Sequence, residues 1–213
     1  MIHAFKKPVI TGIILALLLQ AAPLLAEDKN PEPAPPLAPS TVTRILGDQA
    51  MVFSLGAFVP LFFVRFSDGT VEATNLSLGA KGSIQYMTYL SPHFTLGFEL
   101  MGGFAFTPNF NIYWTLPITA LISYVIPIGT WSIFFNLGLG VDFQSFLGYT
   151  HMDPFVRPQV AVYMPLDPSL ELGLVAGYWL VPQFATPEQE ANKPGQSRLG
   201  NFLDISLSLI YHF

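Results

Sequence analysis

The sequence predicts an all-β protein that folds as a membrane-spanning, eight-stranded, antiparallel up-and-down β-barrel. Of the 213 residues 51% are hydrophobic and only 11% are charged, which is too few charges for an ordinary water-exposed surface. Beyond residue 26 no apolar stretch reaches the roughly 20 residues that a membrane-spanning helix requires. Apolar and polar residues instead alternate with the two-residue period of a β-strand.

The amino-terminal segment has the features of a secretory signal peptide. Lys6 and Lys7 precede a compact apolar run from Val9 to Leu19, and the small residue Ala26 offers a cleavage site. An uncleaved helical anchor is the alternative, but the apolar run is short for a membrane span. We therefore expect residues 1–26 to be removed from the mature protein.

A short linker is expected to separate the signal peptide from the barrel. Residues 27–45 begin with "EDKNPEPAPPLAPS", a proline-rich and charged composition that is typical of an extended segment without a packed core. We interpret this segment as a periplasmic linker. Residues 46–213 then form the outer-membrane β-barrel.

Eight segments combine alternation with the aromatic and β-branched residues that strands prefer. In the last segment, "LDISLSLIYHF", leucine, isoleucine and aromatic residues occupy one face almost without exception. The eight predicted strands are Ala50–Val59, Asn75–Tyr89, Phe94–Phe106, Ile112–Ile126, Trp131–Leu147, Phe155–Met164, Leu170–Val181 and Leu203–Phe213.

The connections alternate between tight turns such as "LSPH", "PIGT" and "PLDPS" and links that are longer or more polar on average. An even strand number with short turns on one side and longer loops on the other is typical of bacterial outer-membrane barrels. The two longest predicted loops cover residues 60–74 and 182–198, and "GYTHMD" is predicted to be a further loop. A soluble barrel would need a polar outer face, whereas here the apolar face is the one almost free of charge.

Three prolines fall inside or near predicted strands. Pro117, Pro158 and Pro182 each lack the N–H group that a strand donates to its neighbour. We expect them to mark bulges or strand ends. In hydrocarbon the edges of the sheet cannot remain unpaired, so the last strand is expected to pair with the first.

The polar positions that alternate with the apolar ones along the strands include six charged residues. Their side chains should point into the lumen. An eight-stranded barrel is only wide enough inside for side chains or one small ligand, so these charges must pair or keep water. They could form a structural plug of ion pairs, or a gate or polar track for solutes. The predicted lumen-lining charges are Lys81, Glu99, Asp142, Arg157, Glu171 and Asp204.

No catalytic, cofactor-binding or metal site is predicted, and we do not expect an enzyme. The chain has no cysteine, and its net charge of −5 disfavours nucleic acid as a partner. His151 and Asp153 could supply two metal ligands, but a third is missing. His93 and His212 lack a serine and a carboxylate at matching height.

The carboxy-terminal strand resembles the signal that the outer-membrane barrel assembly machinery reads. The residues that carry this resemblance are Leu207, Leu209, Tyr211 and Phe213. The eight strands resemble the small outer-membrane barrels of the OmpW, OmpX and OmpA-transmembrane type. The proline-flanked turns and the scarcity of charge resemble the small barrels of spirochaetes. The resemblance covers about residues 46–213 and implies location in the bacterial outer membrane, with outer-membrane lipid and the assembly machinery as partners.

The resemblance implies two functions. OmpW-like members suggest a porin-like transport protein, a narrow pore or conduit for small solutes, including hydrophobic ones. OmpX-like and OmpA-like members suggest a closed structural barrel that acts as a surface-exposed adhesin or host-interaction protein through loops 60–74 and 182–198. Neither implies a cofactor. Both functions remain open at the level of sequence, because alternation carries no ligand motif.

Overall fold

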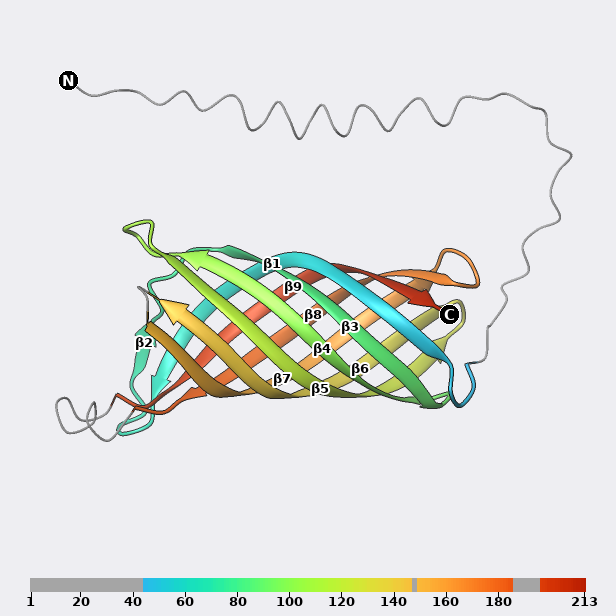
Figure 1. Ribbon diagram of the computed structural model, residues 1–213, viewed down its shortest axis with the longest axis horizontal. Coiled ribbons are helices and arrows are strands. Elements are labelled where there is room, and N and C mark those ends of the chain that lie inside the picture. The colour runs from blue at the N-terminus through green and yellow to red at the C-terminus, as the bar shows by residue number, and fades with distance from the viewer. Residues whose placement is uncertain (1–43, 147–148, 186–195) are drawn as a thin grey trace, which may run out of the picture. The chain divides into compact units, whose positions relative to one another are not determined.

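The computed structural model describes residues 44–146, 149–185 and 196–213, which form one closed β-barrel (Figure 1). The predicted signal peptide and most of the predicted linker lie outside the described residues. Among the described residues no helix is long and apolar enough to cross a membrane. The barrel strands are β1 (Gln49–Arg65), β3 (Gly79–Ser91), β4 (Phe94–Phe106), β5 (Ile112–Ile128), β6 (Trp131–Phe146), β7 (Tyr149–Pro165), β8 (Leu170–Gln183) and β9 (Arg198–His212).

Each barrel strand pairs antiparallel with the next, and β9 pairs with β1 to close the sheet. The closing ladder is long and runs from Ala50 opposite His212 to Arg65 opposite Arg198. A short additional strand, β2 (Val71–Ala73), folds back on the end of β1. Closure leaves no long edge of the barrel unpaired, which hydrocarbon surroundings require. The predicted eight-stranded antiparallel barrel is confirmed.

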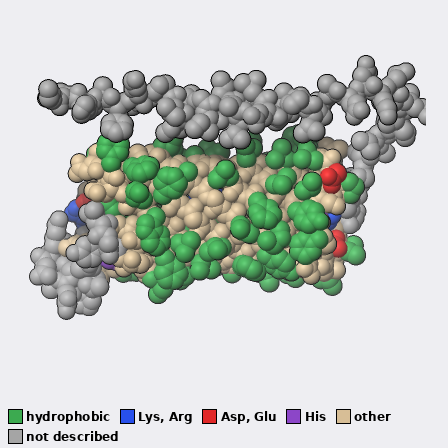
Figure 2. Space-filling view, turned by 45° about the horizontal axis from the view of Figure 1, so that its top comes forward, with side chains coloured by type: hydrophobic (Ala, Val, Ile, Leu, Met, Phe, Trp, Pro, Cys, Tyr) green, Lys and Arg blue, Asp and Glu red, His purple; other side chains and the backbone are tan. Residues whose placement is uncertain are grey.

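The alternation of the sequence separates an apolar exterior from a mixed interior. Outward residues such as Leu55, which is 72% exposed, and Leu207, which is 61% exposed, have no protein cover. In Figure 2 hydrophobic side chains are spread over the visible wall, and the visible charged side chains lie near its two ends. Lipid can cover such a wall, whereas water disfavours this much exposed apolar surface.

Several strands extend beyond the predicted segments. β1 continues to Arg65 and then turns into β2, so much of predicted loop 60–74 is a strand hairpin. β7 begins at Tyr149, so the prediction that "GYTHMD" is a loop is wrong for most of its residues. The physical reason is that the sheet continues beyond its apolar band, where polar residues can occupy either face of a strand.

The prolines fit the ladder in different ways. Pro117 and Pro158 lie inside strands of unchanged register, so the prediction of a bulge or strand end is wrong for both. The pairing of β5 with β4 and of β7 with β8 skips two residues at these prolines, which accommodates the missing donors. Pro182 lies one residue before the end of β8, as expected. A register shift occurs instead between Pro60 and Phe62 in β1.

Candidate functional site: a filled lumen and an outer vestibule

The barrel has two ends that differ in their connections. At the terminal end, β1 begins, β9 ends, and short turns join β3 to β4, β5 to β6 and β7 to β8 (right-hand end of Figure 1). The opposite end, which we call the loop end, carries β2 and the links from β4 to β5, β6 to β7 and β8 to β9. Between these ends the inward side chains form three layers.

The layer nearest the terminal end is apolar and aromatic. Phe134 packs edge-on against Tyr163, with ring centroids 5.2 Å apart. The Tyr163 hydroxyl forms a hydrogen bond of 3.0 Å with Ser208, which satisfies its polar end inside the barrel. The buried members of this lower apolar layer are Ala50, Val52, Met87, Tyr89, Val125, Phe134, Ala161, Tyr163, Val175 and Ile210.

The middle layer is a network of charges centred on Asp204. Lys81 donates from Nζ to Asp204 Oδ2 over 2.9 Å, and Arg157 donates from Nε and Nη2 to the two oxygens of the same carboxylate over 3.0 and 2.9 Å. Trp179 adds an indole N–H donor to Asp204 Oδ1. The Asp204 side chain therefore meets four N–H donors, which belong to three residues on β3, β7 and β8.

Glu99 completes the middle layer. The Arg157 Nη1 group donates to Glu99 Oε2 over 2.7 Å. Arg157 therefore forms ion pairs with two carboxylates, those of Glu99 and Asp204. The side chains of Lys81, Glu99, Arg157 and Asp204 are at most 4% exposed. Lys81 and Arg157 balance Asp204 and Glu99 in formal charge. We call this set the ion layer.

Above the ion layer, toward the loop end, lies a second apolar layer. Phe58 stacks on Phe202 with centroids 5.2 Å apart and also packs on Trp179 at 4.9 Å. Phe155 meets the other side of the same indole edge-on at 5.2 Å. The buried members of this upper apolar layer are Phe58, Phe63, Met101, Ala105, Tyr113, Phe155, Trp179, Val181 and Phe202. The described side chains thus fill the lumen across its middle, as expected for a barrel of this size.

The loop end opens into a cavity of about 1010 Å³, which we call the outer vestibule. Arg65 lies on one wall, where it forms ion pairs with Asp68 and Glu72. Arg198 lies with its guanidinium 3.8 Å from the ring centroid of Phe63. The lining includes charged, amide and aromatic side chains, among them Phe63, Arg65, Glu72, Tyr113, Gln144, Phe146, His151, Asp153, Gln183, Phe184 and Arg198.

Two carboxylates lie side by side at the outer vestibule, and one of them, Asp153, lines the cavity. Asp142 of β6 and Asp153 of β7 are direct partners in the ladder, and both side chains are buried. Asp142 accepts a hydrogen bond from Thr115, and Asp153 accepts a long one of 3.4 Å from Gln144. We call Asp142 and Asp153 the acidic pair. It is separate from the ion layer, although Asp142 was predicted among the same set of lumen-lining charges.

Glu171 lies at the terminal end and not in the ion layer. Its Oε1 atom is 3.1 Å from Arg44 Nη2 and 2.9 Å from His212 Nε2. The six predicted lumen-lining charges therefore occupy three heights. Lys81, Glu99, Arg157 and Asp204 meet, whereas Asp142 and Glu171 do not join them.

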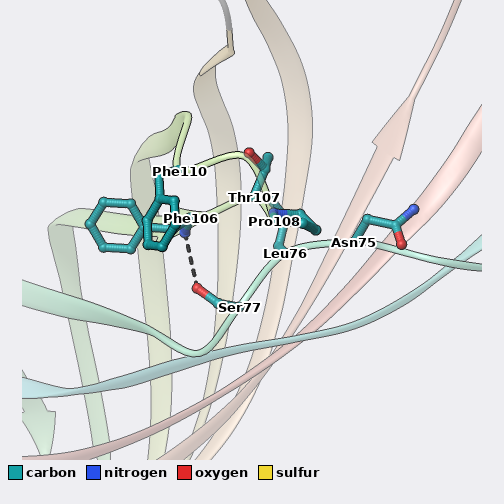
Figure 3. Close-up of a pocket in the computed structure, with 7 residues that line it drawn as sticks. All are labelled: Asn75, Leu76, Ser77, Phe106, Thr107, Pro108 and Phe110. Atoms are coloured by element: carbon teal, nitrogen blue, oxygen red, sulfur yellow. Dashed lines mark hydrogen bonds between the residues drawn. The ribbon is translucent and has the colours of Figure 1, made fainter. Parts of the chain in front are cut away.

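A second, apolar cavity of about 600 Å³ lies at the loop end between the segment before β3 and the turn from β4 to β5 (Figure 3). The Ser77 hydroxyl accepts a hydrogen bond of 3.2 Å from the Phe106 amide and ties the two segments together. Phe110 is 86% exposed and has a φ of +59°, a strained backbone for a bulky residue. Sequence patterns gave no sign of this cavity, because its walls are irregular segments.

The barrel architecture is shared with known proteins. Neisserial surface protein A matches with a TM-score of 0.57 and 10% identity, over 78% of this chain and 97% of that protein. The outer membrane protein OprG from Pseudomonas aeruginosa matches with a TM-score of 0.48 and 10% identity, over 79% of this chain and 97% of OprG. The chain has the fold of the small eight-stranded outer-membrane β-barrels, and its exposed apolar exterior suits the lipid of an outer membrane.

Sequence comparison identifies relatives as well. Residues 33–211 match the model of one protein family, and because this is more than half of the chain, the chain belongs to that family. A Treponema pallidum (strain Nichols) protein described as "Uncharacterized protein" is 25% identical over 137 residues, which are 64% of this chain. The match spans 60% of that relative's length. A spirochaete relative agrees with the predicted resemblance to spirochaetal barrels.

Proposed function

We propose that the protein is a closed, non-enzymatic outer-membrane barrel that binds an extracellular ligand in the outer vestibule. The observation that carries this proposal is the filled lumen. Two apolar layers and the ion layer occupy the barrel interior, and the ion-layer side chains are at most 4% exposed. A cavity of about 1010 Å³ lies at the loop end, which in outer-membrane barrels faces the cell exterior.

A pore is the second candidate, and the same geometry disfavours it. Any continuous path would have to separate Arg157 from Asp204 and Glu99, whose contacts are 2.7–3.0 Å long. Breaking a buried ion pair by removing one partner costs about 3–5 kcal/mol, so spontaneous opening of this network is rare. A conduit for hydrophobic solutes meets the further obstacle that charges separate the two apolar layers.

Assembly by the barrel assembly machinery remains part of the proposal. Of the residues that resemble its signal, Leu207, Leu209 and Tyr211 lie on β9 and Phe213 follows it directly. Leu207, Tyr211 and Phe213 project outward with 47–61% exposure. Outward aromatic side chains at the terminal end are accessible to a partner before the barrel enters lipid. Replacement of Tyr211 and Phe213 by serine is expected to reduce the heat-modifiable, folded fraction in the outer membrane. An unchanged folded fraction would remove the support for this partner.

Planar-bilayer recording tests whether the barrel is closed. We expect the wild-type protein to show no stepwise conductance, and the Arg157→Ala, Asp204→Ala double variant to leak, because that variant removes the centre of the ion layer and leaves Lys81 and Glu99 without their ion-pair partners. Steady conductance steps from the wild-type protein would contradict the proposal and favour the pore.

Cell attachment tests the role of the outer vestibule. Bacteria that display the wild-type barrel are expected to adhere to surfaces coated with serum and extracellular-matrix proteins. Thr74→Trp, which places a large ring in the vestibule lining, should abolish adhesion, whereas Thr130→Trp in the short turn between β5 and β6 should not. Equal adhesion of both variants, with equal folded protein at the surface, would contradict a vestibule function.

A further inference from the structure

We propose that the acidic pair binds the ammonium group of a small organic amine whose apolar part lies in the outer vestibule. This inference rests on the proposed function, because it names the chemistry of the ligand for the same vestibule. Asp153 lines the cavity, and Asp142 lies directly opposite it on the neighbouring strand. The juxtaposition of two buried carboxylates without a cation is the feature that requires explanation.

The acidic pair has no directly paired cation among the described residues, although the charges of His151 and Arg198 favour the ionised form of Asp153 from a greater distance. Directly opposite residues of an antiparallel pair have Cβ atoms about 4.5–5.5 Å apart, and like charges at that distance destabilise the sheet. Asp142 is 1% exposed and Asp153 is 6% exposed, so water screens this repulsion poorly. Within residues 44–146, 149–185 and 196–213, neither carboxylate forms an ion pair with a lysine, an arginine or a histidine.

The acidic pair also keeps unused hydrogen-bond acceptors. The buried Asp142 Oδ2 atom has no hydrogen-bond partner, while Oδ1 accepts from Thr115. Asp153 accepts a weak side-chain hydrogen bond from Gln144 at 3.4 Å and a backbone hydrogen bond from Phe184. An ammonium group has three N–H donors and one positive charge. It can therefore fill the unused hydrogen-bond acceptors and supply the missing positive charge at once.

The arginines of the outer vestibule form their short contacts with groups other than the acidic pair. Arg65 pairs with Asp68 and Glu72, and Arg198 donates from Nε to Gln183 over 2.7 Å while its guanidinium lies over the Phe63 ring. Two of the vestibule's positive groups are therefore held at its wall and not at the acidic pair. Among the described lysines and arginines none lies within ion-pair distance of the acidic pair, so a ligand can supply the neutralising cation.

The cavity walls favour an organic cation over a metal ion. Aromatic rings of the vestibule lining provide apolar and cation-binding surface. The described residues contain no group of three or more histidine, cysteine, aspartate or glutamate side chains that could hold a metal ion. The aromatic members of the lining are Phe63, Tyr113, Phe146 and Phe184.

Calorimetric titration of the folded barrel in detergent micelles tests the inference, with phenethylammonium as the probe and 2-phenylethanol as its uncharged counterpart. We expect the amine to bind measurably at pH 8 and the alcohol to bind at least about tenfold more weakly, as loss of a charge-assisted contact implies. Asp153→Asn should lower amine affinity about tenfold or more, and Asp142→Asn should lower it less. Asp68→Asn, an exposed carboxylate outside the pair, is the matched control and should bind like the wild type.

Three outcomes would overturn the inference: equal binding of amine and alcohol, unchanged amine binding by folded Asp153→Asn protein, or binding of Ca²⁺ without binding of the amine. These outcomes are distinguishable from failure of the proposed function. If the amine does not bind but Thr74→Trp still abolishes cell adhesion, only the ligand class is wrong. If Thr74→Trp leaves adhesion intact, the vestibule function itself fails.

Discussion

The ion layer and the acidic pair solve the problem of buried charge in opposite ways. In the ion layer, Asp204 and Glu99 are each met by a cationic donor, and the formal charges cancel. In the acidic pair, Asp142 faces Asp153, and the pair has no cation of its own among the described residues. The difference teaches that the ion layer has its counter-charges within the described protein, whereas we propose that the acidic pair takes its cation from a ligand.

The largest expected effect comes from removing the centre of the ion layer. Asp204→Ala leaves Lys81 and Arg157 without their shared partner in a buried site, so the free energy of unfolding should fall by about 3–5 kcal/mol. Urea unfolding of the barrel in lipid vesicles measures this change. Asp68→Asn serves as the exposed control and should stay within about 0.5 kcal/mol of the wild type. A loss of similar size in both variants would mean that the ion layer has no special role.

A charge on the outer wall at the height of the ion layer should have the next largest effect. Ile205 is 51% exposed and follows Asp204 in β9, so its side chain faces lipid where Asp204 faces the lumen. Ile205→Arg should destabilise the barrel in lipid by about 2–4 kcal/mol, and Ile205→Leu should not. If the arginine variant unfolds at the same urea concentration as the wild type, lipid does not cover this wall.

A smaller effect separates hydrogen bonding from packing at the top of the ion layer. Trp179→Phe keeps an aromatic ring between Phe58 and Phe155 but removes the N–H donor to Asp204. We expect a loss of about 1.5–3 kcal/mol, the value of a hydrogen bond to a charged group. Trp131→Phe, an outward tryptophan, is the matched control. Equal losses in the two variants would leave no role for the indole donor.

The smallest expected effect has the opposite sign. Asp142→Asn keeps an oxygen that can accept from Thr115 but removes one of two facing charges. The unliganded barrel should therefore gain about 0.2–1 kcal/mol in unfolding free energy, the range for cross-strand charge pairs. Thermal unfolding without added amine measures the gain. A clear loss of stability would show that the acidic pair is compensated within the protein.

The faces of the strands could be predicted from the sequence, but their ends could not. Alternation placed Leu207 outside and Asp204 inside, because one face of each strand meets lipid along the apolar band. Beyond that band both faces can be polar, so Thr150 and His151 were predicted as loop residues although they extend β7. Their polarity indicates where the apolar, lipid-facing band ends, whereas the strand itself continues.

The candidate site was predictable only in part. The alternation predicted that Lys81, Glu99, Arg157 and Asp204 would point inward, and the structure brings these four side chains into contact. The outer vestibule could not be predicted, because closure brings together walls that are far apart in sequence, such as Phe63 and Arg198. Local sequence patterns do not indicate which distant residues the closure of the barrel brings together.

Double-mutant cycles on the two regions test the account's central claim most directly. The cycle of Arg157→Ala with Asp204→Ala should give a favourable coupling free energy of about 1–3 kcal/mol, because these side chains stabilise each other. The cycle of Asp142→Asn with Asp153→Asn, measured without amine, should give an unfavourable coupling of about 0.5–1 kcal/mol. Coupling of the same sign in both pairs would contradict the contrast between a self-sufficient ion layer and an acidic pair that awaits a cation.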